Sequence, residues 1–360
     1  MTLDAAPAAR NSSARERHVS DYTELSRRVR ETDLMERRYG YYSIRIAILF
    51  ALHVAGAVAF VAIGTSWWQL ALAGGLGLLF TQTAFLGHDA AHKQIFASGK
   101  ANDWAALIIA NLFVGLSRGW WQRKHNRHHG NPNKIGTDPD IGPGVLVFDP
   151  DDQDRRRGFA AWFAKRQGWF FFPLITLEGV ALHVAAVQTV FGRAPVQHRA
   201  LEAALLTVRL VGYVAVVVVF LPLGMALAFL GVQLAVFGFA MGACFAPNHK
   251  GMPLVPKDAA IDFLRRQVLM SRNIRGGRFV DTAMGGLNLQ IEHHLFPSMP
   301  RPNLRRLRPV VLAYCAERGI AYTETSLMES YRIVVRYLNA VGLGQRDPFS
   351  CPVTAQFRSR

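Results

Sequence analysis

The sequence predicts an all-α membrane protein with four transmembrane helices, further re-entrant or interfacial helices, and a helical cap on the cytoplasmic side. Three observations favour this fold class. Hydrophobic residues make up 51% of the 360 residues and charged residues only 18%, whereas a soluble domain contains about 25% charged residues. Several apolar runs are long enough to cross a lipid bilayer. Most of the 12 histidines lie in short clusters near the ends of these runs.

Composition divides the chain into three parts. Residues 1–42 are polar and contain many arginines, and they lack the apolar core of a signal peptide, so we expect a cytoplasmic N-terminal arm. Residues 43–310 contain the apolar runs and the histidine clusters and form the main domain. Residues 311–360 are expected to form a C-terminal cytoplasmic helix followed by a loose tail.

Four apolar runs have the length of a membrane-spanning helix. About 20 residues at a rise of 1.5 Å cross a hydrocarbon core of roughly 30 Å. The run 210–247 contains no charged residue and is too long for one span, so we expect a turn near Pro222 to divide it. Arg209 is expected at the entry of the third span, where its side chain can extend to the interface. The predicted spans lie near residues 43–64, 67–87, 206–222 and 225–246.

Positive charge orients these spans. The turns at 65–66 and 222–224 contain no lysine or arginine, whereas residues 93–168 contain twelve and residues 250–310 contain eleven. By the positive-inside rule, both charged segments and both termini face the cytoplasm. The net charge of +16 is then mainly a property of the cytoplasmic face. No nucleic-acid-binding motif accompanies it, so we expect no nucleic acid as a partner.

Eight of the twelve histidines lie at helical spacing or directly beside a span. Histidines at i, i+3 and i, i+4 share one face of a helix. Imidazole is the commonest metal ligand and a structural zinc needs four ligands, so eight histidines indicate two metal ions, held by the cap as a di-metal site. The three widely spaced cysteines exclude a cysteine zinc site. The candidate ligands are His88, His92, His125, His128, His129, His249, His293 and His294.

A single site requires all of these histidines on one side of the membrane. Asp103–Ser117 separates the first two clusters and is short for a span, so it must dip into the membrane and return. Trp169–Phe191 carries Glu178 and other polar residues, and a crossing here would place His249 on the wrong side. We therefore favour an interfacial helix for this segment, with a fifth transmembrane helix as the alternative.

Acidic residues beside the clusters are candidates for orienting the histidine rings. Asp89 and Glu292 each adjoin a candidate ligand in sequence, and a carboxylate can accept a hydrogen bond from a ring nitrogen. Asp138-Pro139-Asp140 follows the second cluster. We interpret it as a loop, with an acid that orients a ligand as the alternative.

Seven of these histidines lie in three motifs: Gly87-His88-Asp89-Ala90-Ala91-His92, Trp121-Gln122-Arg123-Lys124-His125-Asn126-Arg127-His128-His129, and Gln290-Ile291-Glu292-His293-His294. These motifs closely resemble the histidine boxes of the integral-membrane fatty acid desaturase family. The resemblance covers residues 40–310. It implies a non-haem centre of two Fe ions that uses O2 to remove two hydrogens from adjacent methylenes and leave a cis double bond. The substrate would be a fatty acyl chain of a coenzyme A thioester or a membrane lipid; a hydroxylase or ketolase on the same scaffold is the alternative.

Gln290 departs from the usual pattern of the family, and His249 lies outside the three motifs. Many family members begin the third box with histidine, and here the position is Gln290. Glutamine there is similar to the branch that desaturates between an existing double bond and the carboxyl end, and to related bacterial enzymes. Because glutamine is a poor iron ligand beside imidazole, we place Gln290 behind the ligands. His249 matches a further family histidine and is the eighth ligand, with a solvent-facing loop histidine as the alternative.

Electrons must come from a separate donor, for which the resemblance implies a ferredoxin or a flavin-dependent reductase. The chain contains no cysteine cluster for an iron–sulfur centre. A basic face can steer an acidic ferredoxin, bind anionic lipid, or bind the phosphates of coenzyme A. Its residues are Arg155, Arg156, Arg157, Arg301, Arg305, Arg306 and Arg308.

The acyl chain must be held against the metals in a narrow apolar tunnel. Trp120 and Trp121, beside the second cluster, are candidate lining residues, and interfacial anchoring is their alternative role. A metal transporter or a histidine-rich structural membrane protein would instead carry charged residues or histidines inside its spans. Only His53 lies there, so the sequence favours an enzyme.

Overall fold

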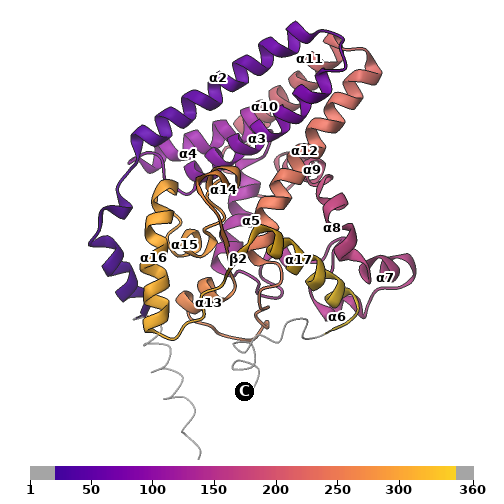
Figure 1. Cartoon of the computed structure of the whole chain (residues 1–360). Helices are drawn as coiled ribbons and strands as arrows, with labels where there is room; N and C mark the ends of the chain where they lie inside the picture. The colour runs from indigo at the N-terminus through magenta and orange to yellow at the C-terminus, as the bar shows by residue number, and fades with distance from the viewer. Residues whose placement is uncertain (1–20, 346–360) are drawn as a thin grey trace, which may run out of the picture.

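The computed structural model describes residues 21–345. Within this range the strands are one short parallel pair, β1 (Asn273–Arg275) with β2 (Glu324–Ser326), and the rest of the regular structure is helical. The predicted all-α class is therefore confirmed. The first 20 residues of the predicted arm and residues 346–360 of the predicted tail lie outside the described residues. Figure 1 shows long helices in the upper part of the molecule and a cap of shorter elements below them.

Four helices among the described residues are long and apolar enough to span a membrane, as predicted. The helices α3 and α12 pack closely at Gly77, where an added Cβ would lie 2.8 Å from the carbonyl oxygen of Gln233. Both helices continue past the predicted ends of their spans, so that His88 and His249 lie on the last turns of these helices. The four are α2 (Tyr39–Ile63), α3 (Gln69–Ala91), α10 to α11 (Arg199–Phe220) and α12 (Leu223–His249).

The third spanning helix carries Arg209 at its middle, not at its entry as predicted. The helix begins ten residues earlier, at Arg199, and consists of α10 (Arg199–Thr207), the π-helical turn η4 (Val208–Gly212) and α11 (Tyr213–Phe220). The Arg209 guanidinium lies over two aromatic rings, 4.5 Å from the ring centroid of Phe80 and 4.2 Å from that of Tyr213. Its Nε donates a hydrogen bond to the Phe113 carbonyl at 3.0 Å. These contacts stabilise the Arg209 guanidinium within the protein, so the side chain does not extend to the membrane interface.

The segment Asp103–Ser117 is mostly one helical stretch, and the chain turns back at Gly115 after it, which agrees with the prediction of a dip and return. It consists of most of α4 (Gly99–Ile108) and a π-helical turn, η2 (Ile109–Val114). An ion pair of 2.6 Å between Arg118 and Asp103 joins the residue after the segment to its beginning. The chain therefore leaves the segment close to where it entered.

Two further apolar helices form a bent pair. The axes of α8 (Gln167–Ile175) and α9 (Glu178–Phe191) differ by 69°, and the described residues contain a fifth span only if this pair is counted as one. The side chain of Gln167 donates a hydrogen bond to the Leu338 carbonyl, in the C-terminal helix of the cap. At the other end the Val190 carbonyl accepts a hydrogen bond from Arg199, the first residue of the third span. Both ends thus adjoin the cap side of the molecule, which favours the interfacial interpretation over a crossing.

The remaining elements build the cap and the loops around it. Helical residues 21–30 pack their apolar face against α13, α15 and α16 in one buried core. An ion pair of 2.6 Å between Arg301 and Asp89 attaches this cap to α3. The elements are α5 (Arg118–Gly130), α6 (Pro150–Gln153), α7 (Gly158–Ala164), α13 (Phe263–Leu269), α14 (Arg278–Ala283), α15 (Gln290–Leu295), α16 (Arg301–Glu317) and α17 (Leu327–Gly342), with the 3-10 turns η1 (Asp33–Met35) and η3 (Pro139–Ile141).

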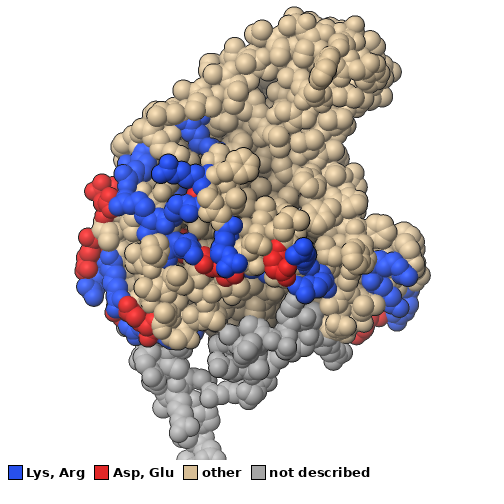
Figure 2. Space-filling model, viewed as in Figure 1, with Lys and Arg blue, Asp and Glu red and all other residues tan. Residues whose placement is uncertain are grey.

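Charge is distributed between these two parts as the sequence indicates. Figure 2 shows lysine, arginine and acidic residues gathered over the lower part of the molecule, whereas the long helices above show almost none. The upper part is suited to contact with lipid, and the lower part to contact with water and lipid headgroups.

Candidate metal centre

The eight candidate histidines come together where the spans meet the cap. They come from the end of α3, from α5, from the end of α12 and from α15. In the first group the ligand nitrogens all lie within 4.8 Å of one another, and the same is true of the second group. The first group is His88, His92, His125 and His293; the second group is His128, His249 and His294.

His129 lies between the two groups. Its Nε2 atom is 3.1 Å from Nε2 of His293, a member of the first group. Its ring stacks on the ring of His294, a member of the second group, with centroids 4.2 Å apart. All eight histidines therefore belong to one continuous cluster with two centres.

Local structure explains how α5 presents three of these rings together. Ser117 caps the helix, because its hydroxyl accepts a hydrogen bond from the backbone N–H of Trp120 at 3.1 Å. Once the helix is set, the spacings i, i+3 and i, i+4 place His125, His128 and His129 on the side that faces α3 and α15. The sequence pattern and the geometry agree here.

Burial keeps these rings in the form that binds metal. Burial, together with neighbouring imidazoles, lowers the pKa of His125, His129, His293 and His294 well below the ordinary histidine value. The rings are therefore neutral at physiological pH and offer a lone pair to a metal.

The arrangement of ring nitrogens fits metal ions. The buried Nε2 atoms of His88 and His294 have no hydrogen-bond partner among the described residues. Nε2 atoms of His92 and His125 face each other at 2.8 Å, and those of His128 and His249 at 3.2 Å. Nitrogens turned toward a common point, some of them without a protein partner, are what a metal site requires.

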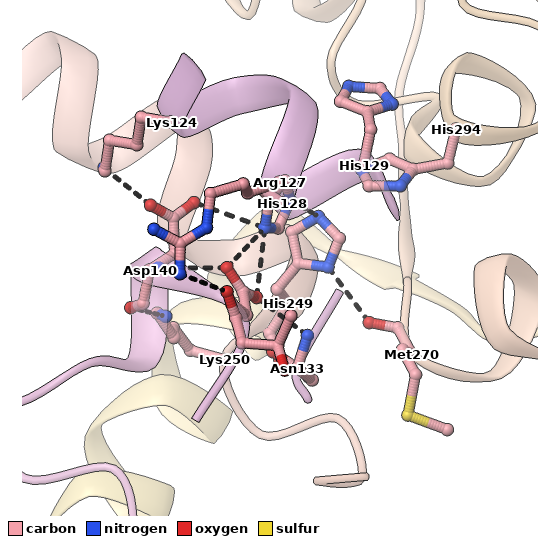
Figure 3. A network of polar contacts seen from close by, with 12 residues as sticks. Lys124, Arg127, His128, His129, Asn133, Asp140, His249, Lys250, Met270 and His294 are labelled. Carbon is pink, nitrogen blue, oxygen red and sulfur yellow. Dashed lines mark hydrogen bonds and ion pairs between the residues drawn. The ribbon is translucent and has the colours of Figure 1, made fainter. Parts of the chain in front are cut away.

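The outward ring nitrogens of the second group each have a protein acceptor. His128 Nδ1 lies 3.0 Å from an Asp138 carboxylate oxygen. His249 Nδ1 lies 3.0 Å from the Met270 carbonyl, as Figure 3 shows. His294 Nδ1 lies 2.8 Å from the side-chain oxygen of Gln267. With Nδ1 donating outward, each ring directs an unprotonated Nε2 toward the centre.

The position of Asp138 corrects the interpretation of its segment as a loop alone. The 3-10 turn η3 follows it, and the Asn133 backbone N–H donates to its carboxylate at 2.8 Å, which turns the side chain back toward His128. Gln267 and the Met270 carbonyl were not predicted. They lie more than twenty residues from the rings that they contact, and the sequence contains no spacing signal that could link them.

Asp89 adjoins the His88 ring, whereas Glu292 is bound by other residues of the cap. Asp89 Oδ1 is 3.7 Å from His88 Nδ1, too far for a hydrogen bond, and its carboxylate is paired with Arg301. Glu292 accepts hydrogen bonds from Asn273 at 2.7 Å and from Tyr322 at 2.6 Å. Both carboxylate oxygens of Glu292 are therefore engaged by residues of the cap.

Gln290 lies beside the second group. Its amide Nε2 is 2.9 Å from His249 Nε2, and its amide oxygen accepts a hydrogen bond from Asn248 at 3.2 Å. His249 itself is buried, which excludes the alternative of a solvent-facing loop histidine. The amide of Gln290 thus lies against the second group, which holds three imidazoles where the first group holds four.

A cavity of about 570 Å³ begins at the histidines. Its inner wall includes His88, His125 and His249, and most of the remaining wall is apolar. Trp120 and Trp121 both line it, as predicted, and Trp121 also stacks on the His125 ring at a centroid distance of 4.2 Å. The size and lining suit an extended apolar chain rather than a small polar ligand.

The predicted basic face is not continuous. Arg301 is buried and paired with Asp89, so it cannot contribute to a surface. Three other arginines of this face each form an ion pair of 2.5 to 2.7 Å, which offsets their charge. These pairs are Arg305–Asp281, Arg306–Asp33 and Arg308–Glu324.

Fold and site together define a helical membrane protein with a cluster of histidines that could hold metal ions, beside an apolar cavity. The family model described as fatty acid desaturase matches residues 65–326. The chain belongs to this family of oxidoreductases.

Curated relatives with similar sequences have related names. The chain is 28% identical to an acyl-lipid (9-3)-desaturase of Physcomitrium patens, over 90% of this chain and 63% of the relative. It is 28% identical to a protein of the same name from Borago officinalis, over 84% of this chain and 69% of the relative. It is 27% identical to delta(8)-fatty-acid desaturase 2 of Arabidopsis thaliana, over 92% of this chain and 78% of the relative.

Proposed function

We propose that this protein introduces a cis double bond into a fatty acyl chain. The observation that carries the proposal is the convergence of eight imidazoles, six of them buried, in one cluster that lines an apolar cavity through His88, His125 and His249. In the overall reaction, two hydrogens from adjacent methylenes, two external electrons and two protons reduce one O2 to two waters. Acid–base side chains cannot break an unactivated C–H bond, so a redox metal is needed.

Two Fe ions are the cofactor that the histidines suit best. One ion would be held by His88, His92, His125 and His293, the other by His128, His249 and His294, with His129 between them. When bound, the iron pair would supply the oxygen activation. Imidazole suits iron among several first-row metals, and the family membership favours iron over zinc.

The side chains of the protein itself position the reactants. The apolar cavity wall would hold the acyl chain extended and exclude water from the centre. Trp121, stacked on His125, would fix both that ring and the adjacent stretch of the chain. Asp138, Gln267 and the Met270 carbonyl would keep the second group of rings in place as the metals change charge.

The cap would face the cytoplasm and receive electrons there. The positive-inside rule and the charge on the cap support this orientation for the termini and for the metal centre. A separate ferredoxin or flavin-dependent reductase would donate the electrons. Within this topology residues 1–42 form a cytoplasmic arm, 43–310 the catalytic domain, and 311–360 a cytoplasmic helix and tail.

Product analysis tests the proposal. The chain would be expressed with an electron donor in a host that lacks the product, and fatty acid methyl esters would be profiled by gas chromatography and mass spectrometry. We expect a new unsaturated acid with wild-type protein, none with His293→Ala, and an unchanged product with His198→Ala, a histidine outside the cluster. A hydroxy or keto acid instead would establish the hydroxylase or ketolase. Protein that binds no iron and forms no product would contradict the proposal.

A further inference from the structure

The short helices between the cavity and the cap form a protrusion with exposed aromatic side chains. In Figure 1, α6, α7 and α8 project at the right of the molecule, beside the lower end of α12. Phe159 is 77% exposed and Trp169 73% exposed, and Trp162 stacks on Phe159 with ring centroids 5.4 Å apart. Large exposed aromatic groups on one protrusion are typical of a surface that inserts into the interfacial layer of a membrane.

Basic side chains surround these aromatic groups. Four of them are exposed, and the Arg166 guanidinium also lies 4.8 Å from the Trp162 ring centroid. In Figure 2 the protrusion shows lysine and arginine on the side nearer the long helices and acidic residues on the side away from them. The positive side of the protrusion therefore faces the membrane surface, where the phosphates of the lipid headgroups lie. The basic residues are Arg155, Arg157, Lys165 and Arg166, together with half-buried Arg156. Arg155 also forms a long ion pair of 3.5 Å with Asp152, in which its side chain stays 79% exposed.

The protrusion is attached directly to the mouth of the cavity. Val145 and Leu177 both line the cavity, yet they are 63% and 60% exposed, so the cavity opens between the loop at 142–146 and the bend between α8 and α9. Arg156 donates hydrogen bonds to the carbonyls of Gly144 and Val145 in that loop. A phosphate bound by the neighbouring arginines would lie at the opening, and an apolar chain attached to it can extend inward to the histidines.

We propose that residues 150–177 form a docking platform for the headgroup of an anionic glycerophospholipid whose acyl chain enters the cavity sideways from the bilayer. This inference rests on the proposed function, and it assigns the acyl carrier: a membrane lipid rather than a soluble coenzyme A thioester. Two observations support a lipid. The mouth of the cavity is formed by exposed apolar side chains, and contact with lipid is more favourable for such side chains than contact with water. The aromatic and basic groups occur together, as at other membrane-binding surfaces.

Photolabelling tests the platform without requiring turnover. Iron-loaded protein would be placed in nanodiscs that contain a trace of phosphatidylglycerol or phosphatidylcholine with a diazirine in one acyl chain. After illumination, labelled peptides would be mapped by mass spectrometry. We expect labels on buried cavity residues such as Phe85, Val114 and Phe171, with phosphatidylglycerol favoured about fivefold for each basic residue that contacts its phosphate.

Variants make the test specific. In Arg155→Gln/Arg157→Gln/Arg166→Gln, the preference for phosphatidylglycerol should fall to near 1, with unchanged iron content as the check on folding. The matched control is Arg27→Gln/Arg30→Gln/Lys257→Gln, three exposed residues away from the mouth, which should keep the wild-type preference. The proposal is overturned if only a diazirine acyl-coenzyme A labels the cavity, or if the triple variant keeps the wild-type preference. In either case an independent product analysis still decides the proposed function.

Discussion

The two histidine groups of the centre are held in different ways. In the first group, four imidazoles pack against one another and against Trp121, which stacks on His125. In the second group, three imidazoles each donate outward to a protein acceptor, and the amide of Gln290 lies beside them. The first group is thus complete in histidine and oriented by packing, whereas the second has one histidine fewer and is oriented by hydrogen bonds.

This difference indicates that the two groups depend on different parts of the fold. The first depends on how the cap docks against α3, because the buried ion pair between Arg301 and Asp89 adjoins His88. The second depends on local segments near residues 138 and 267–270. Substitutions chosen on each side should therefore affect iron at one position before the other.

The largest effect is expected when one ligand is removed from each group. His92→Ala and His249→Ala should each reduce product to the background level, since oxygen activation needs both ions, and iron should fall from two per chain toward one. Iron per chain and Mössbauer spectra of 57Fe-loaded protein would show which position is lost. If the same spectral component disappeared in both variants, the division into two groups would be wrong.

A smaller effect is expected from the ion pair that docks the cap. Asp89→Asn removes the charge partner of a buried guanidinium, which costs about 3 kcal/mol of stability. The melting temperature in detergent should fall, and iron should be lost first from the first group, next to His88. The control is Asp281→Asn, which breaks an exposed pair with Arg305 and should cost less than about 1 kcal/mol. Equal losses in the two variants would contradict the role assigned to Asp89.

The acceptors of the second group should have an intermediate effect. Asp138→Ala removes the partner of His128 Nδ1, and loss of such a partner typically costs 10- to 100-fold in metal affinity or activity. Iron titration with a competing chelator would measure the affinity, and Asp33→Ala, at a surface pair, is the control. A Mössbauer change confined to the first group's component would contradict this assignment.

The fold and the clustering of the histidines could be predicted from sequence because both depend on local spacing. Apolar runs of span length and histidines at i, i+3 and i, i+4 are periodic signals within one helix. The number of membrane crossings between α3 and α12 then predicts that the ends of these two helices that carry histidines lie on the same side of the membrane. The placement of Arg209 was wrong because the third helix begins within a polar segment, at Arg199, which hydropathy alone does not mark.

The surroundings of the ligands could not be predicted, because they come from distant segments. Gln267 reaches His294 across 27 residues, and Arg301 reaches Asp89 across 212. Sequence adjacency suggested Glu292 instead, but the helix turns that carboxylate toward Asn273 and Tyr322. Such pairings depend on how the cap folds over the spans, and no local pattern encodes them.

The smallest expected effect concerns Gln290, and it tests the asymmetry of the two groups most directly. If the amide only supports His249 through the 2.9 Å contact, Gln290→Ala should lower iron affinity of the second group about tenfold and leave the first unchanged. Gln290→His would supply a fourth imidazole there, so it should retain two iron ions and bind the second more tightly than wild type. Chelator competition would rank the three proteins. Tighter binding in Gln290→His would mean that the missing histidine sets the difference between the groups. Unchanged affinity in both variants would mean that the difference lies wholly in the hydrogen-bonded acceptors behind the rings.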